Sequence, residues 1–174
     1  MQNRLLPLLA LSLLILLGLF FANTEAAAQV FRTPLGEYTW GTVGGSRESQ
    51  GVSREDVIAR QGVCPTGGCV LKLDGVEVRP ARARPGDTLT LTTVYTILTP
   101  EQAALPVSII REIFFQGQAL GRTKSIDSRV LNGTWTHDLD FTLPADARPG
   151  LYTLRTTVST GYDSKQKEVR FEVY

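Results

Sequence analysis

Few residues in this sequence could carry out chemistry, and most of them lie far apart. The two cysteines, Cys64 and Cys69, are separated by the segment Pro-Thr-Gly-Gly, and the one histidine is His137. A thiol redox motif has two residues between its cysteines, and a structural zinc site needs about four ligands. Because Pro and Gly favour a turn, we interpret Cys64 and Cys69 as a local disulfide, with two reduced thiols as the alternative.

The segment around His137 holds the densest group of candidate catalytic or metal-binding side chains. On an alternating strand His137 faces the interior, whereas Asp138 and Asp140 face outward. We interpret His137 as a satisfied, partly buried histidine, with a catalytic base as the alternative. We interpret the two carboxylates as a solvated face, with a calcium site, which needs six or more oxygens, as the alternative.

Further catalytic signatures are missing from the sequence. It has no nucleophile elbow, no phosphate-binding loop and no dinucleotide fingerprint. A nucleophile also needs a base beside it, and no such pair is evident. We therefore predict that the protein is not an enzyme and has no catalytic residues, metal site or cofactor.

The charged and aromatic residues offer only general candidates for binding. Arg79, Arg82 and Arg84 form a small basic patch that could meet anionic polysaccharide or lipid headgroups, with ordinary soluble surface as the alternative. Tyr162 and Trp40 are candidate contact residues, but no ligand-binding residue is assigned. The net charge of +1 argues against a nucleic-acid partner.

The N-terminal region has the layout of a secretory signal peptide. Arg4 precedes an unbroken apolar run from Leu5 to Phe21, and Ala26 and Ala28 form an A-x-A cleavage site before Gln29. We predict a signal peptide over residues 1–28 and a secreted or periplasmic protein, where a disulfide persists. An uncleaved membrane anchor is the alternative, because the run is close to the length of a spanning helix.

The next segment, residues 29–68, is rich in Gly, Ser, Arg and Glu and has no sustained hydrophobic period. We interpret it as a partly ordered, flexible leader that ends in the local disulfide. Within it, SREDVIARQG predicts one or two helical turns with Ser53 as the N-cap and acidic residues in the first turn. The leader is either a spacer or a peptide that docks onto a partner.

From residue 69 to 174 the sequence changes to repeated alternation with a period of two. The expected strands are VLKLDGVEVRP, DTLTLTTVYTIL, VSIIREIFFQG, QALGRTKSI, TWTHDLDFTLP, LYTLRTTVSTG and KEVRFEVY. Alternation places one inward face on the second of these strands and one on the sixth: Leu89, Leu91, Tyr95 and Ile97, and Tyr152, Leu154, Thr156 and Val158. Asp74-Gly75 is a hairpin turn or a bulge, Asn132-Gly133 is a hairpin turn, and Thr99-Pro100 begins a helical turn. About seven strands without a long helix predict an all-β fold, a single immunoglobulin-like β-sandwich.

The segments PGDTLTLTTVYTI, NGTWTHDLDFTLP, ARPGLYTLRTTVSTG and KEVRFEVY resemble bacterial immunoglobulin-like modules. The turn Gly150-Leu151-Tyr152-Thr153-Leu154 carries this resemblance best, and it implies that Tyr152 anchors a corner. The same region is also similar, less extensively, to the carbohydrate-binding sandwich at the C-terminus of O-antigen ABC transporters. The resemblance covers residues 70–174 and indicates a fold that serves many functions.

The sequence therefore predicts an exported, non-enzymatic binding module that recognises a protein partner or a cell-surface glycan. The alternatives are a structural accessory subunit of an envelope complex, and a hydrolase or a hydrolase inhibitor. The expected partner is a protein or polysaccharide of the cell envelope, with contact to the membrane only if the apolar N-terminus stays uncleaved.

Overall fold

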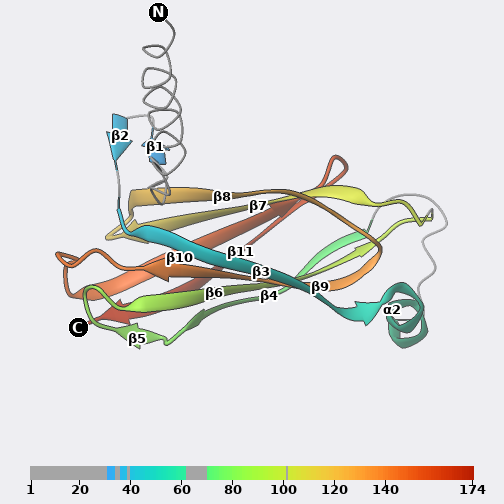
Figure 1. Cartoon of the computed structure of the whole chain (residues 1–174), viewed down its shortest axis with the longest axis horizontal. Helices are drawn as coiled ribbons and strands as arrows, with labels where there is room; N and C mark the ends of the chain where they lie inside the picture. The colour runs from blue at the N-terminus through green and yellow to red at the C-terminus, as the bar shows by residue number, and fades with distance from the viewer. Residues whose placement is uncertain (1–30, 34–35, 39, 62–69, 101) are drawn as a thin grey trace, which may run out of the picture.

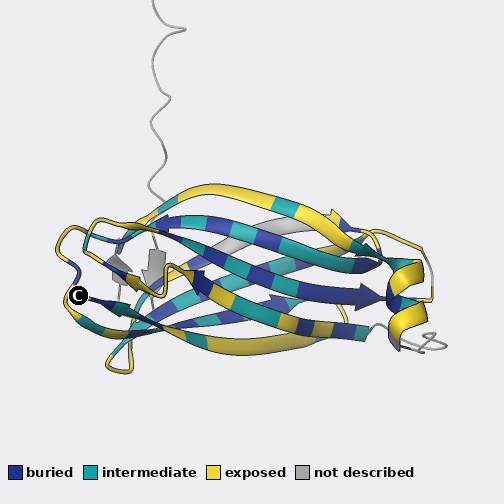
Figure 2. Ribbon diagram, turned by 90° about the horizontal axis from the view of Figure 1, so that it is seen from below, coloured by how far each residue is buried: buried dark blue, intermediate teal, exposed yellow. Residues whose placement is uncertain are grey.

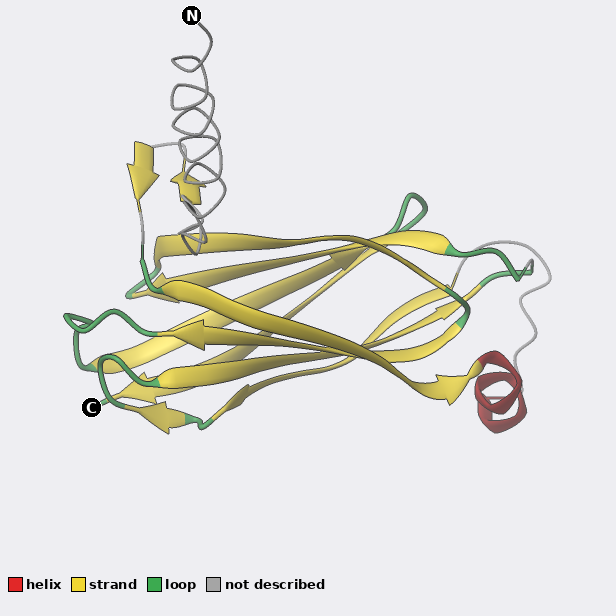
Figure 3. Ribbon diagram, in the orientation of Figure 1, coloured by secondary structure: helices red, strands yellow, loops and turns green. Residues whose placement is uncertain are grey.

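The computed structural model describes residues 31–33, 36–38, 40–61, 70–100 and 102–174. Long strands dominate these residues, and a short helix lies at one end of them (Figure 3). The strands form two main sheets and a small two-stranded sheet. The predicted all-β class is confirmed.

The first main sheet has four strands, and the second has five (Figure 1). The first has the order β3 (Thr42–Ser53), β9 (Gly133–Thr142), β6 (Thr88–Leu98), β4 (Val70–Arg79). The second has the order β5 (Arg82–Ala83), β11 (Ser164–Val173), β10 (Gly150–Ser159), β7 (Leu105–Phe115), β8 (Gln118–Val130). The small sheet pairs β1 (Phe31–Thr33) with β2 (Gly36–Tyr38), and helix α2 (Arg54–Gln61) follows β3.

The core lies between the two main sheets, where alternate residues of the central strands are buried (Figure 2). It consists of two apolar clusters. One contains Leu89, Leu91, Ile113, Leu139, Phe141, Leu154 and Phe171, with Tyr152 among them. The other contains Leu71, Leu73, Tyr95, Ile97, Val107, Ile109, Val130 and Val158. The inward positions expected on β6 and β10 are confirmed by this burial.

A layer of buried polar residues lies along the same strands between the two clusters. Arg111 on β7 and Thr93 on β6 are both fully buried, and His137 on β9 is 7% exposed. Arg111 stands beside Thr156 of β10 and Thr123 of β8 in the sheet register, and both are buried. The alternating pattern of apolar residues thus continues through this level of the sandwich with polar side chains in the inward positions.

Aromatic rings close one end of the sandwich around Tyr152. Its ring stacks against Phe115 at 4.6 Å, Phe171 at 5.3 Å and Trp40 at 5.5 Å between centroids. Its hydroxyl donates to the carbonyl oxygen of Arg148, four residues earlier, at 2.7 Å. The expectation that Tyr152 anchors this corner is therefore met.

Part of the predicted leader belongs to the sandwich. β3 pairs antiparallel with β9 over most of its length, although a Gly- and Ser-rich sequence gave no strand pattern. The register shifts twice, between Val43 and Ser46 and between Gln50 and Val52, which breaks the alternation that sequence analysis depends on. The helical turns predicted after Ser53 are confirmed as α2, and the predicted bulge or hairpin near Gly75 is a bulge within β4.

Two local expectations are wrong. Asn132-Gly133 is not a hairpin turn, because β8 before it pairs with β7 in one sheet while β9 after it pairs with β3 and β6 in the other. The segment is a crossover between sheets. The helical turn expected from Thr99 is absent over Thr99, Pro100 and residues 102–104, because Thr99 is bonded to Asn132 instead.

Other expectations fall on parts of the chain that the structure leaves undescribed. The signal peptide, residues 1–28, and the pair Cys64 and Cys69 lie outside the described residues. Within the described ranges, no helix has the length and apolar character of a transmembrane span.

Candidate functional site

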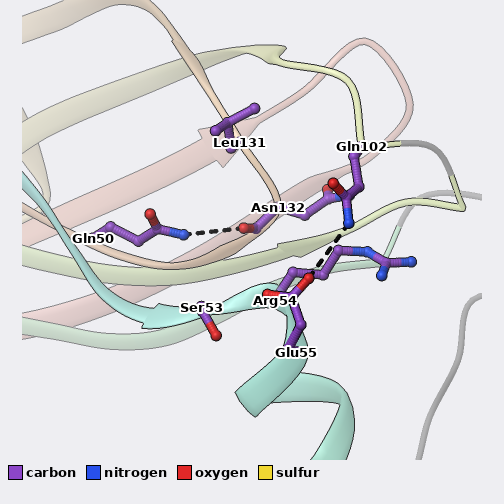
Figure 4. A pocket seen from close by; sticks show the side chains of 7 residues that line it. All are labelled: Gln50, Ser53, Arg54, Glu55, Gln102, Leu131 and Asn132. Atoms are coloured by element: carbon purple, nitrogen blue, oxygen red, sulfur yellow. Dashed lines mark hydrogen bonds between the residues drawn. The ribbon is translucent and has the colours of Figure 1, made fainter.

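A pocket of about 220 Å³ opens at the end of the sandwich where β3 runs into α2 (Figure 4). Three separate segments build it: the end of β3 with the start of α2, the crossover between β8 and β9, and the segment before β7. Its lining residues are Gln50, Ser53, Arg54, Glu55, Gln102, Leu131 and Asn132.

Asn132 holds the crossover in place. Its side chain is 4% exposed, and its Oδ1 accepts hydrogen bonds from the Thr99 amide at 3.2 Å and the Thr99 hydroxyl at 3.0 Å. Its Nδ2 donates to the Thr99 carbonyl oxygen at 3.2 Å. Gln50 Nε2 donates to the Asn132 carbonyl oxygen at 3.1 Å, which ties β3 to the crossover.

Glycine is required next to Asn132. Gly133 has a φ of +142°, and a Cβ there would lie 2.5 Å from the carbonyl oxygen of Val52. Side chains other than hydrogen do not fit such an approach. The crossover backbone can therefore pass close to β3, directly beside the lining residue Asn132.

The helical wall of the pocket begins at a capped helix end. Ser53 Oγ accepts from the Asp56 amide at 3.2 Å and donates to the Asp56 carboxylate at 3.0 Å, which is the pattern of an N-cap. The next two residues, Arg54 and Glu55, line the pocket. Gln102 Nε2 donates to Glu55 Oε1 at 3.4 Å across the opening (Figure 4).

Leu131 gives the pocket an apolar side. It is 53% exposed, and its carbonyl oxygen accepts from Trp135 Nε1 at 2.8 Å, which fixes the backbone there. Amide, hydroxyl and charged groups therefore face the same small space as one aliphatic side chain. A ligand that carries hydroxyl groups on an apolar ring would satisfy both kinds of surface.

His137 lies in the polar layer, away from this pocket. Arg111 Nη2 lies 3.1 Å from its Nδ1 and donates to its carbonyl oxygen at 3.3 Å and to Thr93 Oγ1 at 2.8 Å. Burial, with the positive charge of Arg111, lowers the pKa of His137, while Glu48 and Asp138 act in the opposite direction. Burial also lowers the pKa of Arg111 to about 10.

The neighbouring acids are engaged across the sheet surface. Asp138 accepts from Thr92 Oγ1 at 2.6 Å, and Asp140 accepts from Thr90 Oγ1 at 3.1 Å. Asp140 also pairs with Arg47 at 3.2 Å. Within the residues that the structure describes, no group of three or more metal-binding side chains comes together.

The three arginines of the predicted basic patch contact acids or an aromatic ring. Arg79 pairs with Glu77 at 2.7 Å, and Arg82 pairs with Glu172 at 2.9 Å. The guanidinium carbon atoms of Arg82 and Arg84 lie 5.2 and 5.7 Å from the ring centroid of Tyr174. Glu77 and Glu172 therefore balance two of the three positive charges of the patch.

The two aromatic candidates have different surroundings. Trp40 is half-buried and stacks on Phe141 and Tyr152, so it belongs to the packed end of the sandwich. Tyr162 is 74% exposed at the turn between β10 and β11. Neither residue lines the pocket.

None of the pocket residues was among the site candidates from the sequence. They come from segments that no local motif connects, and only the fold brings them together. One usable signal is the pair Asn132-Gly133, because Asn-Gly marks a special backbone conformation. The pair predicts a hairpin turn, whereas the structure has a crossover between the sheets there.

Comparisons with known proteins give no family. No family model matches the chain, and no curated protein matches it. Solved structures with partial similarity include a family 123 glycoside hydrolase from Clostridium perfringens, with a TM-score of 0.44, 13% identity, and coverage of 62% of this chain and 27% of that one. Another is the alkylpurine DNA glycosylase AlkC from Pseudomonas fluorescens, with a TM-score of 0.44, 15% identity, and coverage of 59% and 30%. The chain spans less than a third of either structure, and similarity at this level carries no argument about function.

Proposed function

We propose that this chain is an exported, non-enzymatic binding module with an immunoglobulin-like sandwich, and that it binds a cell-surface glycan in the pocket beside α2. The strand order supports the architecture, because one sheet places β9, β6 and β4 together and the other places β11, β10, β7 and β8 together. This is the arrangement of strands E, B and A against G, F, C and C′ in immunoglobulin-like domains.

The observation that carries the proposed function is the mixed lining of the pocket. Gln50, Gln102 and Glu55 supply amide and carboxylate oxygens that accept from sugar hydroxyls, and Leu131 supplies an apolar surface for the C–H face of a sugar ring. A volume of about 220 Å³ suits one monosaccharide unit rather than a long chain, so the remainder of a polymer would extend into solvent.

The position of the single histidine supports a role in packing rather than catalysis. His137 is 7% exposed and is held between the sheets by Arg111. A general base must come within hydrogen-bond reach of the substrate proton that it removes. A group enclosed in the core is poorly placed for that.

The proposed function is tested by binding of the purified protein to an array of immobilised microbial polysaccharides and oligosaccharides. Leu131→Asp should abolish the binding that the natural protein shows, because a charge replaces the apolar side of the pocket. Leu151→Asp is the matched control, because Leu151 is an equally exposed leucine (56%) at the start of β10. An array without a positive signal, or equal losses in the two variants, would refute glycan binding in this pocket.

A protein partner in an envelope complex is a second candidate, and β3 favours it. This strand lies at the edge of its sheet, pairs on one side with β9 and exposes most of its residues. Its outer edge could add a strand from another chain. A photo-crosslinker at Ser49, which is exposed on β3, should then capture a discrete protein from an envelope extract, while the same crosslinker at Tyr162 should not. Equal capture at both positions would argue against this interface.

A further inference from the structure

The pocket contains one buried donor whose hydrogen bond the protein does not supply. Arg54 Nε is enclosed, and it has no hydrogen-bond partner in the structure as described. Burying such a donor without an acceptor costs about 1–3 kcal/mol. Because Nε is enclosed, a ligand reaches it only when the Arg54 guanidinium group turns toward the pocket, and an acceptor delivered there would remove that cost.

Several other donors of the pocket are already engaged with the protein. Gln50 Nε2 donates to the Asn132 carbonyl oxygen, and Gln102 Nε2 donates to Glu55. The hydroxyl of Ser53 serves the cap of α2. Arg54 Nε, which lacks an acceptor, therefore indicates most clearly which chemical group the ligand carries.

We propose that the pocket selects a sugar acid, and that Arg54 binds its carboxylate. This inference rests on the proposed function and narrows it to glycans that contain uronic acid units. A guanidinium group bonds a carboxylate through two parallel N–H groups, and such charge-assisted bonds are about twice as strong as neutral ones. The same interaction is not offered by the hydroxyl groups of a neutral sugar.

Glu55 limits how much negative charge a ligand of the pocket can carry. It lines the same space as Arg54 and is its neighbour in the first turn of α2. A carboxylate ligand adds one negative charge, which Arg54 balances, whereas a phosphate group brings more charge close to Glu55 and is repelled. The Glu55 carboxylate can also accept hydrogen bonds from the hydroxyl groups of a ligand. A uronic acid has more hydroxyl groups than inorganic phosphate has at neutral pH. The pocket thus favours a hydroxylated monocarboxylate.

Three probes separate this inference from the proposed function in titration calorimetry of the purified protein. They are a trimer of galacturonic acid, the neutral trimer of galactose and inorganic phosphate. The acidic trimer should bind at least about tenfold more tightly than the neutral one. Arg54→Gln should remove this difference and leave the weak neutral binding unchanged.

The matched control is Arg60→Gln, because Arg60 is an exposed arginine in the last turn of the same helix. It should leave all affinities unchanged, while circular dichroism checks that both variants keep their fold. Equal binding of the two trimers, or no loss in Arg54→Gln, would overturn the role of Arg54 and leave glycan binding standing. Tighter binding of phosphate than of the acidic trimer would overturn the preference for a carboxylate. Failure of both trimers to bind at millimolar concentration would refute the pocket as a site for these sugars altogether.

Discussion

Replacing Thr93 with valine tests how the polar layer contributes to stability. The two side chains have nearly the same shape, so Thr93→Val opens no cavity, but it removes the Oγ1 that accepts from Arg111 Nη2 at 2.8 Å. Both residues are fully buried, so water cannot take the place of the lost acceptor. A hydrogen bond to a charged group contributes about 1.5–3 kcal/mol.

We therefore expect Thr93→Val to lower the free energy of unfolding by about 2 kcal/mol, and to lower Tm by about 4–8 °C for a chain of this size. Urea denaturation followed by circular dichroism measures the first quantity, and calorimetry measures the second. Thr153→Val is the matched control, because Thr153 is half-buried on the outer face of β10, and its effect should stay within about 0.5 kcal/mol.

A double-mutant cycle with Arg111→Met separates the hydrogen bond from other effects of the valine. Once the guanidinium group is gone, Thr93→Val should cost less than about 0.5 kcal/mol, so the two changes should be strongly non-additive. Equal costs of Thr93→Val in the two backgrounds would show that the contact with Arg111 does not stabilise the fold and would refute this reasoning.

Three further predictions concern single groups. His137 has a lowered pKa in the folded protein, so the unfolded chain takes up its proton at a higher pH. The free energy of unfolding should therefore be constant above about pH 6.5 and fall as the pH drops below it. His137→Gln should remove this pH dependence from urea denaturation curves measured between about pH 7.5 and 5.5. Tyr152→Phe deletes the bond to the Arg148 carbonyl oxygen and should cost about 0.5–1.5 kcal/mol in chemical denaturation, and an unchanged midpoint would mean that the hydroxyl does not hold the corner. Ser53→Ala removes the cap of α2 and should cost about 0.5–2 kcal/mol, visible as faster amide hydrogen exchange confined to that helix, whereas uniform acceleration through the sheets would contradict a local role.

The sequence predicted the elements whose strands alternate without interruption. The inward residues of β6, including Leu89, Leu91 and Ile97, are buried as expected, because a strand between two packed sheets must alternate. β3 escaped prediction because its two register shifts break the alternation and because Gly44 and Gly45 carry no side chain that could show it. Its place in the sheet depends on pairing with a strand some ninety residues later, which no local pattern encodes.

The pocket could not be predicted for a related reason. Its lining residues come from three segments, and the sequence around each residue already suggests a local structural role. Ser53 is a helix cap, Asn132 precedes a glycine, and Gln102 lies two residues after Pro100. Only the crossover from β8 to β9 brings Asn132 beside Gln50. By contrast, the buried state of His137 followed from its position on an alternating strand, although its partner Arg111 was not anticipated.

The polar layer also limits how the strands can be aligned. A shift of β7 by two residues against β10 would keep every side chain on its own face, so apolar patterning alone does not forbid it. Such a shift would move Arg111 from its place beside Thr156 to one beside Leu154 or Val158, within an apolar cluster. A buried charge that loses its partners costs several kcal/mol. Arg111 therefore favours a single register of β7 against β10. A chain that paired these strands in a register shifted by two residues would be less stable than the native fold.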